Sequence, residues 1–119
     1  MDFTTAIRSC LSQYATFRGR ARRSEFWWFS LFVIGLELVA ALVEGALGVD
    51  GFLSGLVHLL TLLPSLAVGA RRLHDIGRSG WSQLLLIIPI LGWLALVYWW
   101  TRPSTPGPNL YGAAPAYGF

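Results

Sequence analysis

The chain has 119 residues, of which 55% are hydrophobic and 13% are charged, and its formal net charge is +3. A soluble globular domain carries about 25% charged residues, so this composition excludes an ordinary water-exposed surface and indicates a single membrane domain. Every basic residue is arginine, and the arginines flank long apolar runs. This placement favours the lipid bilayer and anionic phospholipid as partners and excludes nucleic acid. The single cysteine, Cys10, excludes an intrachain disulfide.

Residues 2–15 are predicted to form a short amphipathic helix. Apolar residues recur there at helical spacing, namely Phe3, Ile7, Cys10, Leu11 and Tyr14. About 14 residues cannot span a bilayer, so we expect an interfacial helix, with packing against the protein's own loops as the alternative. Residues 17–25 follow as a basic connector, in which Ser24 is expected to cap the next helix.

Two apolar runs predict a transmembrane helical hairpin. The first covers residues 26–47 and opens with an aromatic cluster that is typical of the headgroup boundary. The second covers residues 52–70, after a tight turn at 48–51. About 22 residues of helix measure about 33 Å, which matches a hydrocarbon core of about 30 Å.

A second basic segment covers residues 71–80 and is predicted to be a loop. Eight of the nine arginines lie before the first span or between the second and third apolar runs, and none lies in the turn at 48–51. The positive-inside rule therefore places both basic segments and the N-terminus in the cytoplasm and the turn outside.

The third apolar run, residues 81–100, contains Pro89 and Gly92 near its middle. It can be a spanning helix with a kink, which puts the tail outside, or a re-entrant hairpin, which returns the tail to the cytoplasm. We prefer the full span because lipid tolerates a kink better than an exposed turn. The Pro/Gly-rich tail, 101–119, is expected to be an extended strap or disordered; the strap would touch apolar surface through Leu110, Tyr111, Tyr117 and Phe119.

Three segments, 17–27, 71–81 and 106–112, together carry a resemblance to a known family. In that order, and separated by apolar runs, they resemble the bacterial family of unknown function 805, the YhaH-like small inner-membrane proteins. The resemblance covers almost the whole chain and implies a multi-pass protein of the bacterial cytoplasmic (inner) membrane. It implies no catalytic residues, because no biochemical role is established for the family.

The basic segments carry the first candidate site. Guanidinium groups bind phosphate through two parallel hydrogen bonds, although the same arginines can simply fix the topology. The anion- or lipid-binding candidates are Arg18, Arg20, Arg22, Arg23, Arg71, Arg72 and Arg78. His74 and Asp75 lie among them and are expected to support the loop structure. Because no Cys/His cluster has metal-ligand spacing, we predict no catalytic residue, no metal and no cofactor.

The second candidate site is the polar set Glu37, Glu44 and His58 inside the predicted spans. Ionisable residues in a span are costly and point to a function or to the polar seam of an oligomer. Glu44 and His58 lie at similar distances from the turn, about 10 Å, and are expected to meet across the hairpin. Ala41 and Gly45 have the spacing of small residues that lets membrane helices approach closely, which favours a homo-oligomer.

The sequence thus predicts a non-enzymatic, self-associating membrane module. Its cytoplasmic arginine face would bind anionic lipid or a protein partner. The alternative is a small oligomeric channel or transporter with Glu37, Glu44 and His58 lining a polar path. An enzyme acting on lipid through His74 and Asp75 is the weakest reading, because no nucleophile accompanies them.

Overall fold

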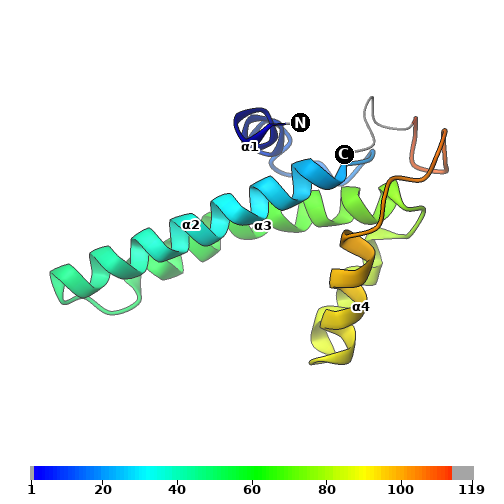
Figure 1. Cartoon of the computed structure of the whole chain (residues 1–119). Helices are drawn as coiled ribbons and strands as arrows, with labels where there is room; N and C mark the ends of the chain where they lie inside the picture. Colours follow the sequence, from blue (N-terminus) through cyan, green and yellow to red (C-terminus); the bar gives the residue numbers. More distant parts are fainter. Residues whose placement is uncertain (1, 114–119) are drawn as a thin grey trace.

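The computed structural model describes residues 2–113, and this part of the chain is all-helical, as predicted (Figure 1). Four α-helices and one 3₁₀ helix follow one another: α1 (Phe3–Ser12), α2 (Arg23–Leu47), α3 (Phe52–Asp75), η1 (Gly80–Ile87) and α4 (Leu91–Trp100). The predicted contacts of Tyr117 and Phe119 lie outside the described residues.

Helices α2 and α3 lie side by side as a long antiparallel hairpin (Figure 1). Their most apolar stretches have mean hydropathies of 2.1 and 1.8, and both helices are long enough to cross a membrane. The protein buries 17% and 22% of the residues in these stretches. A core helix of a soluble protein is mostly buried, so the outward-facing leucines and valines of this hairpin are suited to an apolar solvent.

The turn of the long hairpin is closed by Gly48 and Gly51, which both have a φ of 70°. The Glu44 carboxylate folds back and accepts hydrogen bonds from the backbone N–H groups of Gly51 and Ser54. It therefore caps the first turn of α3, whose N–H groups have no partner within the helix. The expected meeting of Glu44 with His58 is wrong, because the N–H groups at the start of α3 are closer to Glu44.

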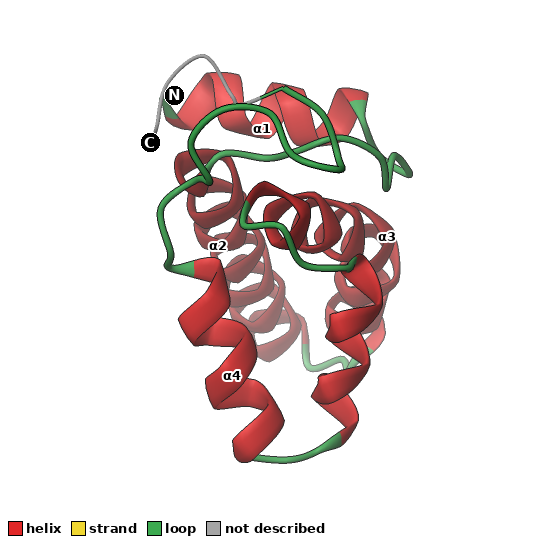
Figure 2. Cartoon of the chain, turned by 90° about the vertical axis from the view of Figure 1, so that its right-hand side faces the viewer, coloured by secondary structure: helices red, strands yellow, loops and turns green. Residues whose placement is uncertain are grey.

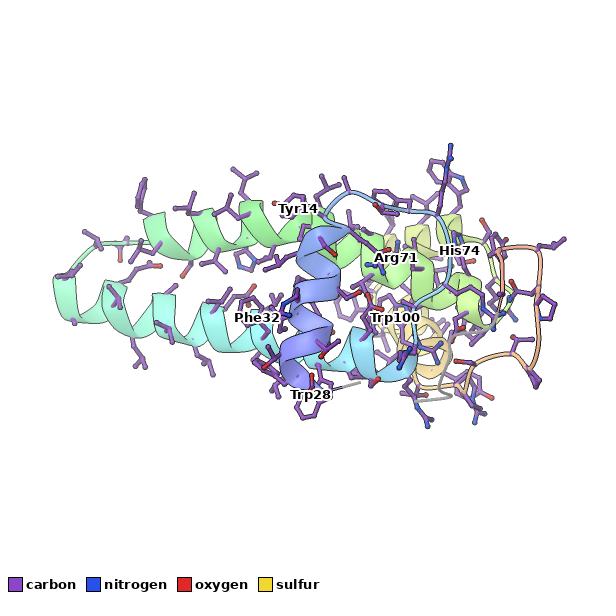
Figure 3. All side chains as sticks on the ribbon, turned by 90° about the horizontal axis from the view of Figure 1, so that it is seen from above. Tyr14, Trp28, Phe32, Arg71, His74 and Trp100 are labelled. Atoms are coloured by element: carbon purple, nitrogen blue, oxygen red, sulfur yellow. The ribbon has the colours of Figure 1, made fainter. Side chains whose placement is uncertain are left out.

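Helix α1 crosses over α2 and α3 (Figure 3). Ala6 and Cys10 on its inner face are fully buried, and Phe3 packs edge-to-face on Trp28 with ring centroids 5.7 Å apart. Beyond the helix, the Tyr14 hydroxyl donates a hydrogen bond to the Leu60 carbonyl. These contacts fix α1 on the protein's own helices.

The two basic segments are more helical than predicted. Helix α2 begins at Arg23 after the cap residue Arg22, so Ser24 lies in its first turn and is not the cap. Helix α3 continues through the predicted loop to Asp75, because neither glycine nor proline interrupts the chain between Ala70 and Ile76. Gly77, with a φ of 81°, then follows the end of the helix.

The third apolar run folds into a second, short hairpin made of η1 and α4, which lie next to each other (Figure 2). Ile90, with φ 66° and ψ −69°, forms a γ-turn that is closed by a 2.8 Å hydrogen bond from the Leu91 N–H to the Pro89 carbonyl. At Gly92 an added Cβ would lie 1.8 Å from the Leu85 carbonyl oxygen, so the hairpin closes only around glycine. The preferred single span over 81–100 is therefore wrong, because the chain reverses at Pro89.

Candidate functional site

The ends of both hairpins meet the connector and the tail at one end of the molecule. We call this region the basic end and define it as residues 17–25, 69–80 and 99–113. Two buried carboxylates, Glu25 and Asp75, organise it, with exposed fractions of 4% and 0%. A buried carboxylate needs cationic or hydrogen-bonding partners, and both find them in arginines of the predicted lipid-binding set.

Glu25 connects three helices. Its Oε2 accepts hydrogen bonds from Arg71 Nη1 at 2.7 Å, from Ser9 Oγ at 3.0 Å and from Cys10 Sγ at 3.6 Å. Arg71 is 1% exposed, and its Nε and Nη2 atoms are buried without a hydrogen-bond acceptor. Burial, followed by the neighbouring negative charge of Glu25, raises the pKa of the Cys10 thiol to about 12.

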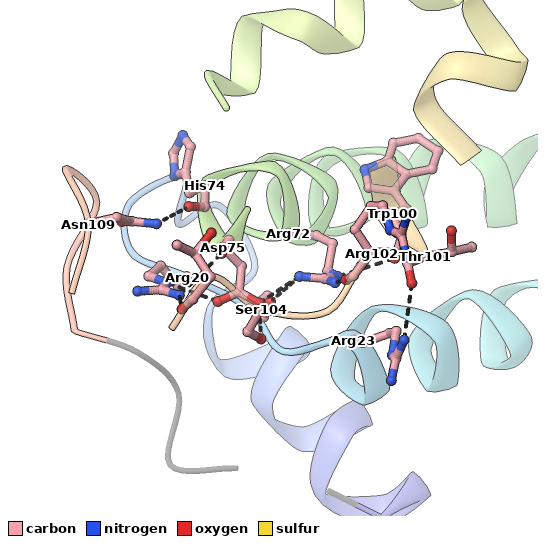
Figure 4. Close-up of polar contacts among 12 residues, drawn as sticks. Arg20, Arg23, Arg72, His74, Asp75, Trp100, Thr101, Arg102, Ser104 and Asn109 are labelled. Atoms are coloured by element: carbon pink, nitrogen blue, oxygen red, sulfur yellow. Dashed lines mark hydrogen bonds and ion pairs between the residues drawn. The ribbon is translucent and has the colours of Figure 1, made fainter. Parts of the chain in front are cut away.

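Asp75 joins α3 to the connector and the tail (Figure 4). Its Oδ1 lies 2.9 Å from Arg20 Nε, and its Oδ2 lies 2.6 Å from Arg72 Nη1 and also accepts from the Ser104 hydroxyl. Arg72 is fully buried and the side chain of Arg20 is 2% exposed. One carboxylate is thus shared by two guanidinium groups inside the protein.

Three arginines of the basic end, Arg20, Arg23 and Arg72, bind backbone carbonyls at the end of α4 and in the tail. Arg20 donates at 2.7 Å to one tail carbonyl and at 2.8 Å to another, and Arg23 donates at 3.1 Å to a third. Arg72 Nε donates at 3.2 Å to the last residue of α4. Arg72 Nη2 also donates to the carbonyl of Arg102. The carbonyls that accept from these arginines are those of Trp100, Thr101, Arg102, Thr105 and Gly107.

His74 is held by the connector and the tail. Its Nδ1 lies 3.0 Å from the Gly19 carbonyl oxygen, and its ring stacks on Tyr111 with centroids 4.0 Å apart. Asn109 Nδ2 donates to the His74 carbonyl at 2.9 Å (Figure 4). A carbonyl can only accept, so Nδ1 carries the proton and Nε2 of the neutral ring is an acceptor. Asp75 is occupied by two arginines, and the two adjacent residues therefore do not form an acid–base pair.

The structure divides the predicted arginine set. Arg20, Arg71 and Arg72 are inside the protein, Arg22 and Arg23 are partly buried, and Arg18 and Arg78 are exposed. Arg102, which was not among the predicted residues, is also exposed at the basic end. Arg102 directly follows the third apolar run. If that run is read as a hairpin, Arg102 is predicted to lie beside the other arginines.

Arg78 and Arg102 flank a shallow hollow with a volume of about 470 Å³. The Arg78 guanidinium lies 4.1 Å from the ring centroid of Trp99, within cation–π distance. The Arg102 guanidinium lies 5.1 Å from the ring centroid of Tyr98, and its Nη1 donates to the Tyr98 hydroxyl at 3.0 Å. The hollow thus combines two exposed cations with two aromatic side chains of α4.

Of the three candidate polar residues of the long hairpin, two form a pair and Glu44 lies apart from them. His58 Nδ1 lies 3.0 Å from Glu37 Oε1, and these two side chains are 68% and 35% exposed. Glu44 is 8% exposed and lies at the turn. Across residues 2–113, no three His, Cys, Asp or Glu side chains converge as metal ligands would.

The fold and the basic end define a small, all-helical protein with two helices long and apolar enough to cross a membrane. A family model described as "Protein of unknown function (DUF805)" matches residues 14–113, and the chain belongs to this family. The chain is 41% identical over 111 residues to inner membrane protein YhaI of Escherichia coli K12, covering 92% of this chain and 94% of the relative.

A second relative, inner membrane protein YhaH of the same organism, is 42% identical over 110 residues, covering 88% of this chain and 91% of the relative. Uncharacterized protein YiiR of Escherichia coli K12 is 34% identical over 87 residues, covering 71% and 56%. No solved structure matches. Both longer matches are with proteins named for the inner membrane, and the apolar hairpin agrees with that setting.

Proposed function

We propose that the protein crosses the bacterial inner membrane with its long hairpin and keeps its basic end in the cytoplasm. The names of the two relatives, the apolar surface of α2 and α3 and the arginine distribution support this placement. The short hairpin also needs an apolar layer, since Trp81, Ile87 and Leu91 are 77%, 79% and 74% exposed. Its reversal returns the tail to the side of the N-terminus.

We propose that the protein is a non-enzymatic, self-associating module whose basic end binds anionic phospholipid. The hollow between Arg78 and Arg102 carries this proposal. Glu25 and Asp75 at this end are buried and already paired with other arginines, so neither neutralises Arg78 or Arg102. Guanidinium groups suit a phosphodiester, and the neighbouring Tyr98 and Trp99 suit headgroup depth.

Lipid counting by native mass spectrometry tests the site. Each arginine near an anionic surface contributes about 1 kcal/mol, so the double variant Arg78→Gln/Arg102→Gln should lower affinity for phosphatidylglycerol about 30-fold. Binding of phosphatidylcholine should change little. The variant Arg8→Gln/Arg18→Gln removes the same charge from two other exposed positions and is the matched control. Equal losses in both double variants would contradict a defined site.

Self-association is supported by the Glu37–His58 pair, which is exposed on an apolar hairpin. An ionisable group that faces lipid costs about 2.5–3.5 kcal/mol, and a second copy packed over the pair would remove that exposure. Ala41 and Gly45 lie on the same helix face as Glu37 and are exposed, so close approach is possible there.

The assembly proposal is tested by the size of the purified protein in detergent. Ala41→Leu/Gly45→Leu should block close approach and shift the protein to the monomer, because bulk is added at the small face. The control Val39→Leu/Val43→Leu adds less bulk to exposed positions on another face of α2 and should leave the oligomer intact. A wild-type monomer at all concentrations would refute self-association.

The channel or transporter alternative uses the same pair. Glu44 is engaged at the turn, so a polar path would rest on Glu37 and His58. Proton flux into liposomes distinguishes the two proposals: the channel requires flux in the wild type that Glu37→Gln reduces. The non-conducting module predicts no flux with either protein.

A further inference from the structure

A second hollow, of about 650 Å³, lies between α3 and η1, and we call it the interhelical groove. Leu66, Ala70 and His74 form one wall, because every fourth residue of a helix lies on the same face. Trp81 and Leu84 of η1 form the opposite wall. The α3 wall extends for about 12 Å, and the volume is in the range of about 300–1,000 Å³ that is usual for small-molecule sites.

Small residues and one amide set the shape of this groove. An added Cβ at Gly80 would lie 2.9 Å from the Ala70 Cβ and 3.4 Å from His74 Nε2, so the two helices are in contact at the floor. Gln83 Nε2 donates to the Leu66 carbonyl at 3.1 Å and ties η1 to α3. The groove is therefore shaped by close contacts between α3 and η1.

The two ends of the groove differ in polarity. His74 and Ser79 lie at the end nearer the tail, where Asn109 binds the His74 carbonyl. The Ser79 oxygen accepts the Trp81 N–H at 3.2 Å, which leaves the hydroxyl proton free for a ligand acceptor. The other end includes Leu66 and Leu84, and neither a carboxylate nor an arginine lines the groove. Such a site suits an amphipathic molecule with a hydrogen-bonding head and an apolar chain.

We propose that the interhelical groove binds one acyl chain of a membrane phospholipid, whose ester and phosphate oxygens lie at the tail end of the groove and accept a hydrogen bond from the Ser79 hydroxyl. The inference rests on the proposed membrane placement, which puts Leu66 on the lipid side of His74. It differs from the proposed headgroup site, because the groove selects for an apolar chain and the hollow at Arg78 and Arg102 selects for charge. Groove occupancy is therefore expected with both zwitterionic and anionic lipids.

Filling the groove tests this proposal by native mass spectrometry in detergent, with dipalmitoyl phosphatidylcholine and dipalmitoyl phosphatidylglycerol as probes. Leu84→Trp and, separately, Leu66→Trp should reduce retention of one lipid at least tenfold with both probes. Leu86→Trp is the control, because Leu86 lies on the same 3₁₀ helix and is 43% exposed but does not line the groove. Full retention by both filled variants would overturn the proposal.

The charge preference is read separately in the same experiment. If filling the groove removes a lipid but phosphatidylglycerol is never preferred, the result supports the groove proposal and contradicts the headgroup site. If phosphatidylglycerol is preferred but filling the groove has no effect on lipid retention, the result contradicts the groove proposal and supports the headgroup site. A photoreactive acyl chain on the wild type avoids substitutions: cross-links should fall on Leu66, Ala70 and Leu84, and equal labelling of Leu38 and Leu42 on α2 would contradict a bound chain.

Discussion

The hydroxyl of Tyr14 donates a hydrogen bond to the backbone carbonyl of Leu60. That carbonyl has lost its usual helical partner, because the residue four positions further on is Pro64, which has no N–H. The segment after α1 thus supplies the donor that α3 lacks at its own proline. A separate set of contacts joins Ser9 and Cys10 to Glu25, so α1 is held to the long hairpin at two points.

Removing this donor should loosen α1. We expect Tyr14→Phe to lower the free energy of unfolding by about 1–2 kcal/mol, because the Leu60 carbonyl is then left without a partner in an apolar setting. Hydrogen exchange should rise in α1 and remain unchanged at the turn of the long hairpin. Unchanged exchange throughout α1 would show that the contact does not hold the helix.

The reactivity of Cys10 reports on the same docking. Its pKa is raised to about 12, so at pH 7–8 the thiol is protonated as well as buried. Since the thiolate is the nucleophile, maleimide should label it very slowly in the native protein and rapidly after denaturation. Labelling should accelerate as the pH rises toward 12 and also in Tyr14→Phe. Fast labelling of the native wild type at pH 7 would contradict the buried contact with Glu25.

The Glu25–Arg71 pair is buried and linked to three helices. Removing one partner leaves a buried charge without compensation, so Glu25→Ala should destabilise the protein by about 3–5 kcal/mol. The measurement is thermal unfolding in detergent.

The double variant Glu25→Gln/Arg71→Met is the informative control. The Nε and Nη2 atoms of Arg71 already lack an acceptor, so losing both charges together should cost much less than losing either alone. Additive losses from the two single changes would mean that the pair is not coupled.

Asp75→Asn tests how the tail is held. The substitution removes the charge shared by Arg20 and Arg72, which bind the tail carbonyls. We expect proteolytic cleavage between residues 103 and 112 to increase at least tenfold while the long hairpin remains intact. Asp50→Asn, at the exposed turn, removes the same charge and should leave cleavage unchanged.

The short hairpin depends on its reversal. Gly92→Ala should disrupt it, because the added methyl group would overlap the Leu85 carbonyl. Ile90→Gly should instead stabilise it by about 1 kcal/mol, because Ile90 is held at a positive φ that glycine adopts without strain. Opposite shifts in Tm for these two variants are the expected result, and two shifts of the same sign would argue against the γ-turn.

The long hairpin was predictable because its signal is local. The apolar runs at 26–47 and 52–70 predicted the turn at 48–51, the end of α2 and the start of α3. Helix α2 begins three residues earlier than predicted, and α3 ends five residues later. The family was predictable because short polar motifs are separated by these runs. Both features are contained in consecutive residues.

The basic end was less predictable because its contacts are distant in sequence. Asp75 meets Arg20 across 55 positions, and nothing local shows that the charge of Arg20 is turned inward. The two acids beside the arginines, Glu25 and Asp75, were the available sign that some guanidinium groups would be buried. At Pro89 the sequence allowed both a kink and a reversal, and the close approach of Gly92 to Leu85 favours the reversal.

The side of the membrane on which each segment lies tests the account most directly. In cells expressing Asp50→Cys, Arg18→Cys or Pro108→Cys in a Cys10→Ala background, a membrane-impermeant maleimide should label Asp50→Cys in intact cells. The other two variants should be labelled only after the inner membrane is permeabilised, because the short hairpin returns the tail to the side of the connector. Labelling of Pro108→Cys in intact cells would contradict the assignment of one basic, cytoplasmic end.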